Sequence, residues 1–90
     1  MGILVRIPTP LRKFTGGQAT VEVEGSTVVE ILKDLDIKYP GIREKLYDGQ
    51  DIKRFINIYL NDEDIRLLGG EQTSVSTGDK VSIIPAISGG

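Results

Sequence analysis

Apolar and polar residues alternate along several segments of this chain, and this period of two predicts β-strands. The alternating segments are residues 2–8, 19–24 and 55–60, and a further apolar run covers residues 81–85. One parity of each segment is expected to face a common core, because successive side chains on a strand point to opposite faces. The predicted inward residues are Ile3, Val5, Ile7, Val21, Val23, Ile56, Ile58, Leu60, Val81 and Ile83.

The first two segments are predicted to form an N-terminal hairpin. Their connection contains Gly16-Gly17, a turn signal. Leu11 and Phe14 lie in this connection and are expected to fold onto the body as loop residues.

One helix is predicted after Gly25, where the period changes from two to that of an amphipathic helix. Thr27 and Glu30 have the spacing of a capping box, although Ser26 could cap the helix instead. Pro40-Gly41 predicts its end. The residues expected to form its buried face are Val28, Ile31, Leu32 and Leu35.

Shorter elements are predicted in the second half of the chain. Ile42 and Leu46 are one helical turn apart and allow a short helix, whereas residues 47–51 indicate a loop. Residues 61–64 predict a polar turn, followed by a brief edge strand at residues 65–67. The acidic residues of that turn could suggest a cation site, but Asn and Asp are also ordinary turn residues, and this explanation is preferred.

The order of these elements predicts an α+β fold with a mixed sheet of about five strands packed on one main helix. The first and last strands are expected to be neighbours at the centre of the sheet. This arrangement resembles the β-grasp fold of ubiquitin. Residues 1–86 are expected to form this domain, and residues 87–90 a flexible C-terminal tail that ends in Gly-Gly.

Composition narrows the possible chemistry. The chain has 90 residues, enough for one domain with a modest core. It contains no Cys and no His, so thiolate nucleophiles, thiolate metal sites and the commonest general base are absent. Its net charge of −2 gives no indication of nucleic-acid binding. With no long apolar run and no leader pattern, a cytoplasmic protein that serves as partner or substrate of enzymes is expected, and not an enzyme.

The end of the sequence is the most informative segment. Three residues separate Gly89 and Gly90 from the last predicted strand, which ends at Pro85. Glycine lacks Cβ, so such a tail could enter a narrow channel in another protein. An activated acyl group at Gly90 could not racemise, because glycine is achiral. The alternative is a terminus without a role.

The whole chain resembles the ubiquitin-like sulfur carriers, a family that includes the small subunit of molybdopterin synthase, the thiamine-pathway carrier and the carrier that feeds a cysteine synthase. The resemblance is closest to the cysteine-synthase branch, through the block Asn-Ile-Tyr-Leu-Asn-Asp-Glu-Asp-Ile-Arg and the single Pro85-Ala86. The segments that carry it are residues 7–9, 11–12, 15–18, 55–66 and 78–90.

The resemblance implies a mechanism centred on Gly90. A partner related to ubiquitin-activating enzymes would adenylate its carboxylate with ATP, and sulfur transfer would then give a thiocarboxylate. The acceptor would be a cysteine synthase with pyridoxal phosphate, followed by a zinc peptidase, or the large subunit of molybdopterin synthase. This chain would bind no cofactor or metal itself. The tail expected to enter partner active sites comprises Ala86, Ile87, Ser88, Gly89 and Gly90.

Two other classes of function remain open. The chain could be a ubiquitin-like modifier that forms isopeptide bonds with lysines, or a plain interaction domain with incidental glycines. Strand parity also predicts a partner-binding patch on the sheet face away from the helix, because exposed apolar, aromatic and Arg side chains mark binding surfaces. The predicted patch consists of Leu4, Arg6, Phe55, Tyr59 and Ile84.

Overall fold

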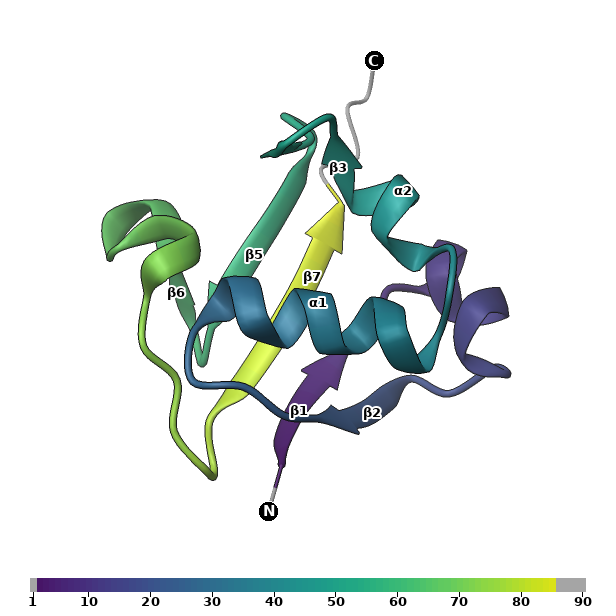
Figure 1. Cartoon of the computed structure of the whole chain (residues 1–90), viewed down its shortest axis with the longest axis horizontal. Helices are drawn as coiled ribbons and strands as arrows, with labels where there is room; N and C mark the ends of the chain where they lie inside the picture. The colour runs from purple at the N-terminus through teal and green to yellow at the C-terminus, as the bar shows by residue number, and fades with distance from the viewer. Residues whose placement is uncertain (1, 86–90) are drawn as a thin grey trace.

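The structure is a computed structural model, and it describes residues 2–85. Its main feature is a five-stranded mixed sheet in the order β2-β1-β7-β5-β6, with one helix, α1, lying across one face (Figure 1). The strands are β1 (Ile3–Arg6), β2 (Thr20–Val23), β5 (Ile56–Leu60), β6 (Glu63–Asp64) and β7 (Lys80–Pro85). This is the predicted β-grasp arrangement.

The centre of the sheet is the pair β1 and β7. Val5 lies beside Val81 in a parallel register, and β7 also pairs with β5 in an antiparallel register, with Ile83 opposite Ile58. These four side chains point to the same face and are buried. The prediction that the first and last strands are central neighbours is therefore confirmed.

Helix α1 (Val28–Lys38) covers the inner face of the sheet, and its four predicted core residues are all buried. Thr27 is the N-cap, and its hydroxyl oxygen accepts a hydrogen bond of 3.3 Å from the Glu30 N–H. Glu30 reaches back to the N–H of Ser26, at 2.8 Å, and not to that of Thr27. Both candidate residues thus take part in capping, but only Thr27 caps with its side chain.

Three short elements complete the side of the molecule near the end of α1. Helix α2 (Ile42–Leu46) is the predicted short helix, and both residues that define it are fully buried. Residues 47–51, predicted as a loop, instead contribute to a small hairpin of β3 (Tyr47–Asp48) and β4 (Asp51–Ile52). Gly49 closes this hairpin with a positive φ of 71°.

The connection between β1 and β2 is the 3₁₀ helix η1 (Thr9–Thr15), where the sequence predicts a loop. Leu11 is buried and Phe14 packs on the core, as predicted. Thr15 is also buried, and its hydroxyl lies within hydrogen-bond distance of the carbonyl oxygens of Arg12 and Gln18. This internal bonding explains why the segment is ordered as a helix.

The predicted edge strand at residues 65–67 is wrong. The edge strand is β6, and Ile65–Leu67 forms the 3₁₀ helix η2. Asn61 has a positive φ of 58°, so the chain reverses directly after β5 and Glu63 already pairs with Leu60. The Asp64 carboxylate then accepts a hydrogen bond from the Arg66 N–H and starts the helical turn. Ile65 is buried and Leu67 is 80% exposed, so their alternation is not that of a strand.

A third 3₁₀ helix, η3 (Gly70–Gln72), precedes the return to β7. It contacts the main body through Glu71, which accepts a hydrogen bond of 2.6 Å from the Tyr47 hydroxyl. Across residues 2–85, none of the helices has the length and apolar character that crossing a membrane would require.

Candidate functional site

The strand that leads to the C-terminal residues is held on both sides. β7 has β1 as a parallel neighbour through Ser82 and β5 as an antiparallel neighbour through Pro85, which lies opposite Ile56. Residue 85 is the last one that the structure describes. The tail predicted from the sequence, including Gly90, therefore lies outside the described residues, and so does the expected boundary at residue 86. What the structure defines is the rigid base from which that segment starts.

The face of the sheet opposite α1, here called the outer face, carries a row of three side chains at its centre. Arg6 on β1 and Tyr59 on β5 are each paired with Ser82 on β7. Ser82 has the outward parity predicted for it but is only 7% exposed. The larger side chains on either side explain this burial, because Ser is too short to rise between them.

A groove follows β7 along this outer face. Its volume is about 630 Å³. Three cationic side chains and one carboxylate line it, together with the hydroxyls of Thr9, Tyr59 and Ser82. The charged residues are Arg6, Arg12, Lys80 and Asp62.

The five residues of the predicted partner-binding patch are placed as follows. Leu4 and Ile84 are exposed on the outer face, at 48% and 43%. They do not touch as one apolar cluster, because Leu4 lies opposite Lys80 while Ile84 lies four residues further along β7, opposite Asn57. Arg6 and Tyr59 line the groove between them. Phe55 is exposed just before β5 begins. Partner binding by this patch stays a prediction.

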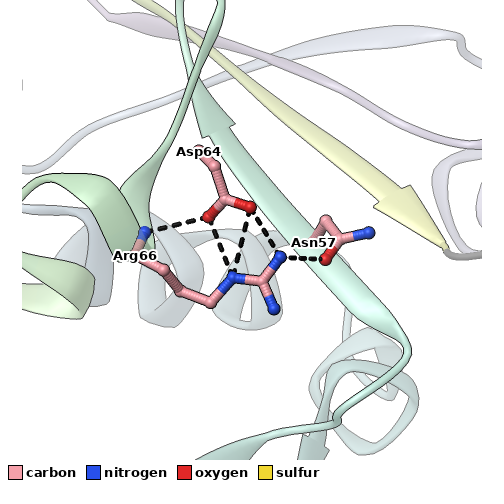
Figure 2. Close-up of polar contacts among 3 residues, drawn as sticks. All are labelled: Asn57, Asp64 and Arg66. Atoms are coloured by element: carbon pink, nitrogen blue, oxygen red, sulfur yellow. Dashed lines mark hydrogen bonds and ion pairs between the residues drawn. The ribbon is translucent and has the colours of Figure 1, made fainter.

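A polar cluster at the edge of the sheet borders the outer face. Figure 2 shows the guanidinium group of Arg66 lying between the side chains of Asp64 and Asn57. Arg66 Nη2 is 2.6 Å from Asp64 Oδ2 and 2.6 Å from Asn57 Oδ1, and its Nε donates to both Asp64 oxygens. Asn57 is opposite Ile84 on β7. The cluster therefore fixes the side chain that neighbours Ile84.

The electrostatics of the cluster follow from these contacts. Hydrogen bonds from the Arg66 side chain, and then from its backbone N–H, lower the pKa of Asp64 below the usual value of an aspartate. The same side-chain hydrogen bonds to Asp64 raise the pKa of Arg66. Both groups are therefore charged at neutral pH, and both Asp64 oxygens are engaged. A carboxylate used in this way is a turn-stabilising group, as preferred from the sequence over a cation site.

Nothing in the described part of the chain offers a metal site, since no three carboxylate side chains come together there in a suitable group. The polar groups that line the groove are three cations, one carboxylate, three hydroxyls and the amide of Asn61, and Ile and Pro residues make up the rest of the lining. The polar groups can form ion pairs and hydrogen bonds with another molecule. The outer face is therefore suited to recognition.

Sequence reasoning missed the contributions of Arg12 and Lys80 to this surface. The sequence pattern places Lys80 in a turn, but this residue has the same parity as Ser82 and Ile84, and extending the alternation by one step would have found it. Arg12 could not be found in this way. It comes from η1, and its Nε–H donates a 3.0 Å hydrogen bond to the Ile7 carbonyl, which holds the side chain at the groove that Ile7 also lines.

Comparisons with known proteins identify the family. A model described as the ThiS family matches residues 5–90. The chain belongs to the ThiS family. It is thus a ubiquitin-like sulfur carrier homologue with the β-grasp fold, as the resemblance implied.

Individual relatives agree with this assignment. The sulfur carrier protein CysO of Mycobacterium tuberculosis is 46% identical over 93 residues, an alignment that covers 100% of both chains. A crystal structure of the Amycolatopsis orientalis BexX/CysO complex matches with a TM-score of 0.92 and 45% identity, covering 98% of this chain and 99% of that one. Small archaeal modifier protein 3 of Haloferax volcanii is 30% identical over 67 residues, covering 74% of this chain and 73% of the relative. ThiS-family proteins such as CysO are small carriers and not catalysts.

Proposed function

We propose that this ThiS-family chain carries sulfur as a thiocarboxylate on Gly90 and donates it in a biosynthetic pathway, that of cysteine. The observation that carries the proposal is the full-length similarity to CysO sulfur carriers, which extends through the terminal residues. The structure supports it in one respect. The described domain ends in a central strand, β7, so a tail that follows residue 85 would start from a fixed position.

The chemistry begins with a poor electrophile. A C-terminal carboxylate has a pKa near 3.5 and is ionised at neutral pH, so it resists attack by a nucleophile. A partner enzyme would use ATP to convert the Gly90 carboxylate into an acyl-adenylate, with release of pyrophosphate. Sulfide would then attack the acyl carbon and AMP would leave. The products are a thiocarboxylate, AMP and a proton.

The domain itself would contribute recognition and not catalysis. Its sequence has no Cys or His, so it lacks a thiolate nucleophile and the commonest general base. ATP, and the pyridoxal phosphate and zinc of later steps, would all be held by partner enzymes. These would be an adenylating enzyme, a cysteine synthase that accepts the sulfur, and a peptidase that releases the product. The Amycolatopsis orientalis CysO forms a complex with BexX, which supports the expectation of such partners.

Intact mass spectrometry tests the proposal. The chain would be incubated with ATP, sulfide and the adenylating enzyme from the same organism. The expected result is a mass increase equal to exchange of one oxygen for sulfur, located at Gly90 by fragmentation. A variant without Gly90 and one with an added C-terminal residue should both stay unmodified. Equal sulfur loading of either variant would contradict the proposal, and circular dichroism would confirm that both are folded.

The activated Gly90 could have two other fates, and experiments can distinguish them from sulfur transfer to a cysteine synthase. The similarity to a small archaeal modifier protein favours, as a second candidate, attachment of Gly90 to lysines of other proteins. Lysine adducts carrying the C-terminal residues of this chain, found by proteomics, would support that role. If the sulfur acceptor were instead the large subunit of molybdopterin synthase, the thiocarboxylate would be consumed by that subunit and not by a cysteine synthase.

A further inference from the structure

The groove over β7 has a size, a shape and a charge that the tail chemistry alone does not require. We propose that it binds an extended acidic segment of the adenylating enzyme that activates the tail. This inference rests on the proposed function for the identity of the partner. The binding chemistry, however, rests on the described residues 2–85, and it can be tested without the tail reaction.

The shape of the groove favours an extended chain. Its floor is the outer side of β7, where the short side chain of Ser82 lies between Arg6 and Tyr59. The lining residues include both ends of the strand, from Lys80 to Pro85. At about 3.3 Å per residue, this corresponds to a length of roughly 17 Å. A trough one strand wide and several residues long fits a peptide in extended conformation.

The charge of the groove favours an acidic occupant. Three cations and one carboxylate line it, although the chain as a whole has a net charge of −2. Across residues 2–85 the ion pairs are Lys38–Asp34 and Arg66–Asp64, so no carboxylate of that part lies within salt-bridge distance of Arg6, Arg12 or Lys80. Arg12 is directed by its hydrogen bond to the Ile7 carbonyl. Complementary carboxylates on a partner would therefore find the cations unpaired and partly fixed.

Hydroxyl groups complete the recognition surface. Thr9, Tyr59 and Ser82 line the same groove and can each donate or accept hydrogen bonds. Such groups suit the alternating backbone and side-chain polar atoms of an extended segment. The exposed apolar residues Leu4 and Ile84 lie near opposite ends of β7, and Ile84 also lines the groove, so apolar contacts would be made near the two ends of the acidic segment.

The position of the groove links it to the tail. It ends at Pro85, and the five residues that follow could span at most about 17 Å from that point. If a partner segment were bound in the groove, Gly90 could therefore reach only those parts of the partner that lie within this distance of Pro85. The contact in the groove would therefore align the tail with the partner's active site. It would also let the partner select this carrier over proteins that lack the three cations.

The first test measures binding without any enzyme. A synthetic peptide that alternates Glu and Thr is titrated into ¹⁵N-labelled protein, and chemical shift changes are followed. Changes at Arg6, Tyr59 and Ser82 are expected, together with loss of affinity as salt is raised. The double variant Arg6→Gln/Lys80→Gln should weaken binding by about tenfold. Its matched control, Lys33→Gln/Lys45→Gln, has the same net charge but alters exposed lysines on α1 and α2, and should bind as wild type.

Three outcomes would overturn the proposal. They are shift changes spread over all lysines and arginines, equal weakening by the control variant, and no shift change in the groove. A peptide alternating Lys and Thr should not bind. If phosphate or ATP produced the same groove shifts more strongly than the peptide, the groove would be an anion site for small molecules and not for a protein segment.

The second test separates this proposal from the proposed function. In the sulfur-loading reaction, Arg6→Gln/Lys80→Gln should raise KM for the carrier by about tenfold and leave kcat unchanged, whereas the Lys33→Gln/Lys45→Gln control should change neither. If wild type is loaded and the groove variant is loaded with the same KM, the groove proposal fails and the carrier function stands. If wild type is not loaded at all, the carrier function fails, and the peptide titration still decides whether the groove binds acidic segments.

Discussion

The guanidinium group of Arg66 donates a 2.6 Å hydrogen bond to Asn57 Oδ1, which joins η2 to the outer face of β5 (Figure 2). The same guanidinium is bound by Asp64, whose carboxylate also accepts from the Arg66 N–H. Asp64 therefore has two roles: it caps the 3₁₀ helix and it orients the arginine. These roles can be separated by substitution.

Asp64→Ala removes both roles and should lower the free energy of unfolding by about 1 kcal/mol, the usual effect of losing a cap. Asp64→Asn is the matched control, since the amide oxygen can still accept from the backbone while the charge is lost, and it should cost less. Urea denaturation at neutral pH measures both. If Asp64→Asn destabilised the protein as much as Asp64→Ala, the ion pair and not the cap would account for the stability.

The contribution of the Asp64 charge should also depend on pH. Its pKa is lowered in the folded state by Arg66, so the stabilisation is present above the pKa of the unfolded chain, near 3.8, and is lost as pH falls through the folded-state pKa. The difference in free energy of unfolding between wild type and Asp64→Asn should therefore shrink on acidification from pH about 5 to about 2. A difference that stays constant over this range would show that the charge does not contribute.

Tyr47 is predicted to stabilise the contact between the β3 region and η3. Its ring is buried, with the Arg43 guanidinium 4.3 Å from the ring centroid, and its hydroxyl donates to Glu71. Tyr47→Phe should lower the free energy of unfolding by about 1–2 kcal/mol, because a hydrogen bond to a charged acceptor is lost. Tyr59→Phe, on the outer face, should have little effect. Equal effects of the two substitutions in urea denaturation would contradict this.

The same tyrosine should contribute to loss of stability in alkali. Burial, and then the Glu71 carboxylate, raise the pKa of Tyr47 in the folded protein. The unfolded chain therefore releases this proton first, and stability is lost as pH rises above about 10. Melting temperatures of wild type should fall more steeply above that pH than those of Tyr47→Phe. Parallel curves would show that Tyr47 is not responsible.

Ile84→Asp tests the predicted partner-binding patch at an apolar residue that also lines the groove. Ile84 is 43% exposed, so the substitution should cost less than about 1 kcal/mol of folding stability. In an apolar contact with the adenylating enzyme, however, the charge would be unpaired. Loading should then fall at limiting carrier and recover as carrier is raised. Ile37→Asp, at a 74% exposed position on α1, is the control, and normal loading of Ile84→Asp would exclude an apolar contact at Ile84.

Metal chelators and reductants should not change the melting temperature of the protein. The sequence contains no Cys or His, and residues 2–85 bring together no group of three carboxylates that could hold a metal ion. Differential scanning calorimetry with and without EDTA, and with and without a thiol reductant, measures this. A chelator-dependent decrease would reveal a site formed with residues that the structure does not describe.

The sequence by itself determined the β-grasp architecture and its core, because burial follows periodicity. The period of two in β1, β5 and β7 and the helical spacing of α1 each select one face, and a single sheet covered by one helix buries all of them together. Position along the chain likewise marked the terminal glycines. The strands and the helix depend on local pattern alone, and the family assignment agrees with the resemblance to ubiquitin-like sulfur carriers.

Tertiary structure alone decided the features that depend on contacts between distant residues. In sequence, Ile65-Arg66-Leu67 has the apolar–polar–apolar pattern of a strand. In the fold, the chain reverses early at Asn61, the Asp64 carboxylate accepts a hydrogen bond from the Arg66 N–H, and the segment is a 3₁₀ helix. Ser82 has outward parity, yet it is buried because the larger side chains of Arg6 and Tyr59 lie on either side of it. Both neighbours belong to strands that are distant from β7 in sequence, so the pattern within β7 could not predict this burial. The groove exists for the same reason: register across three strands, together with Arg12 from η1, assembles charges that no periodicity along one segment encodes.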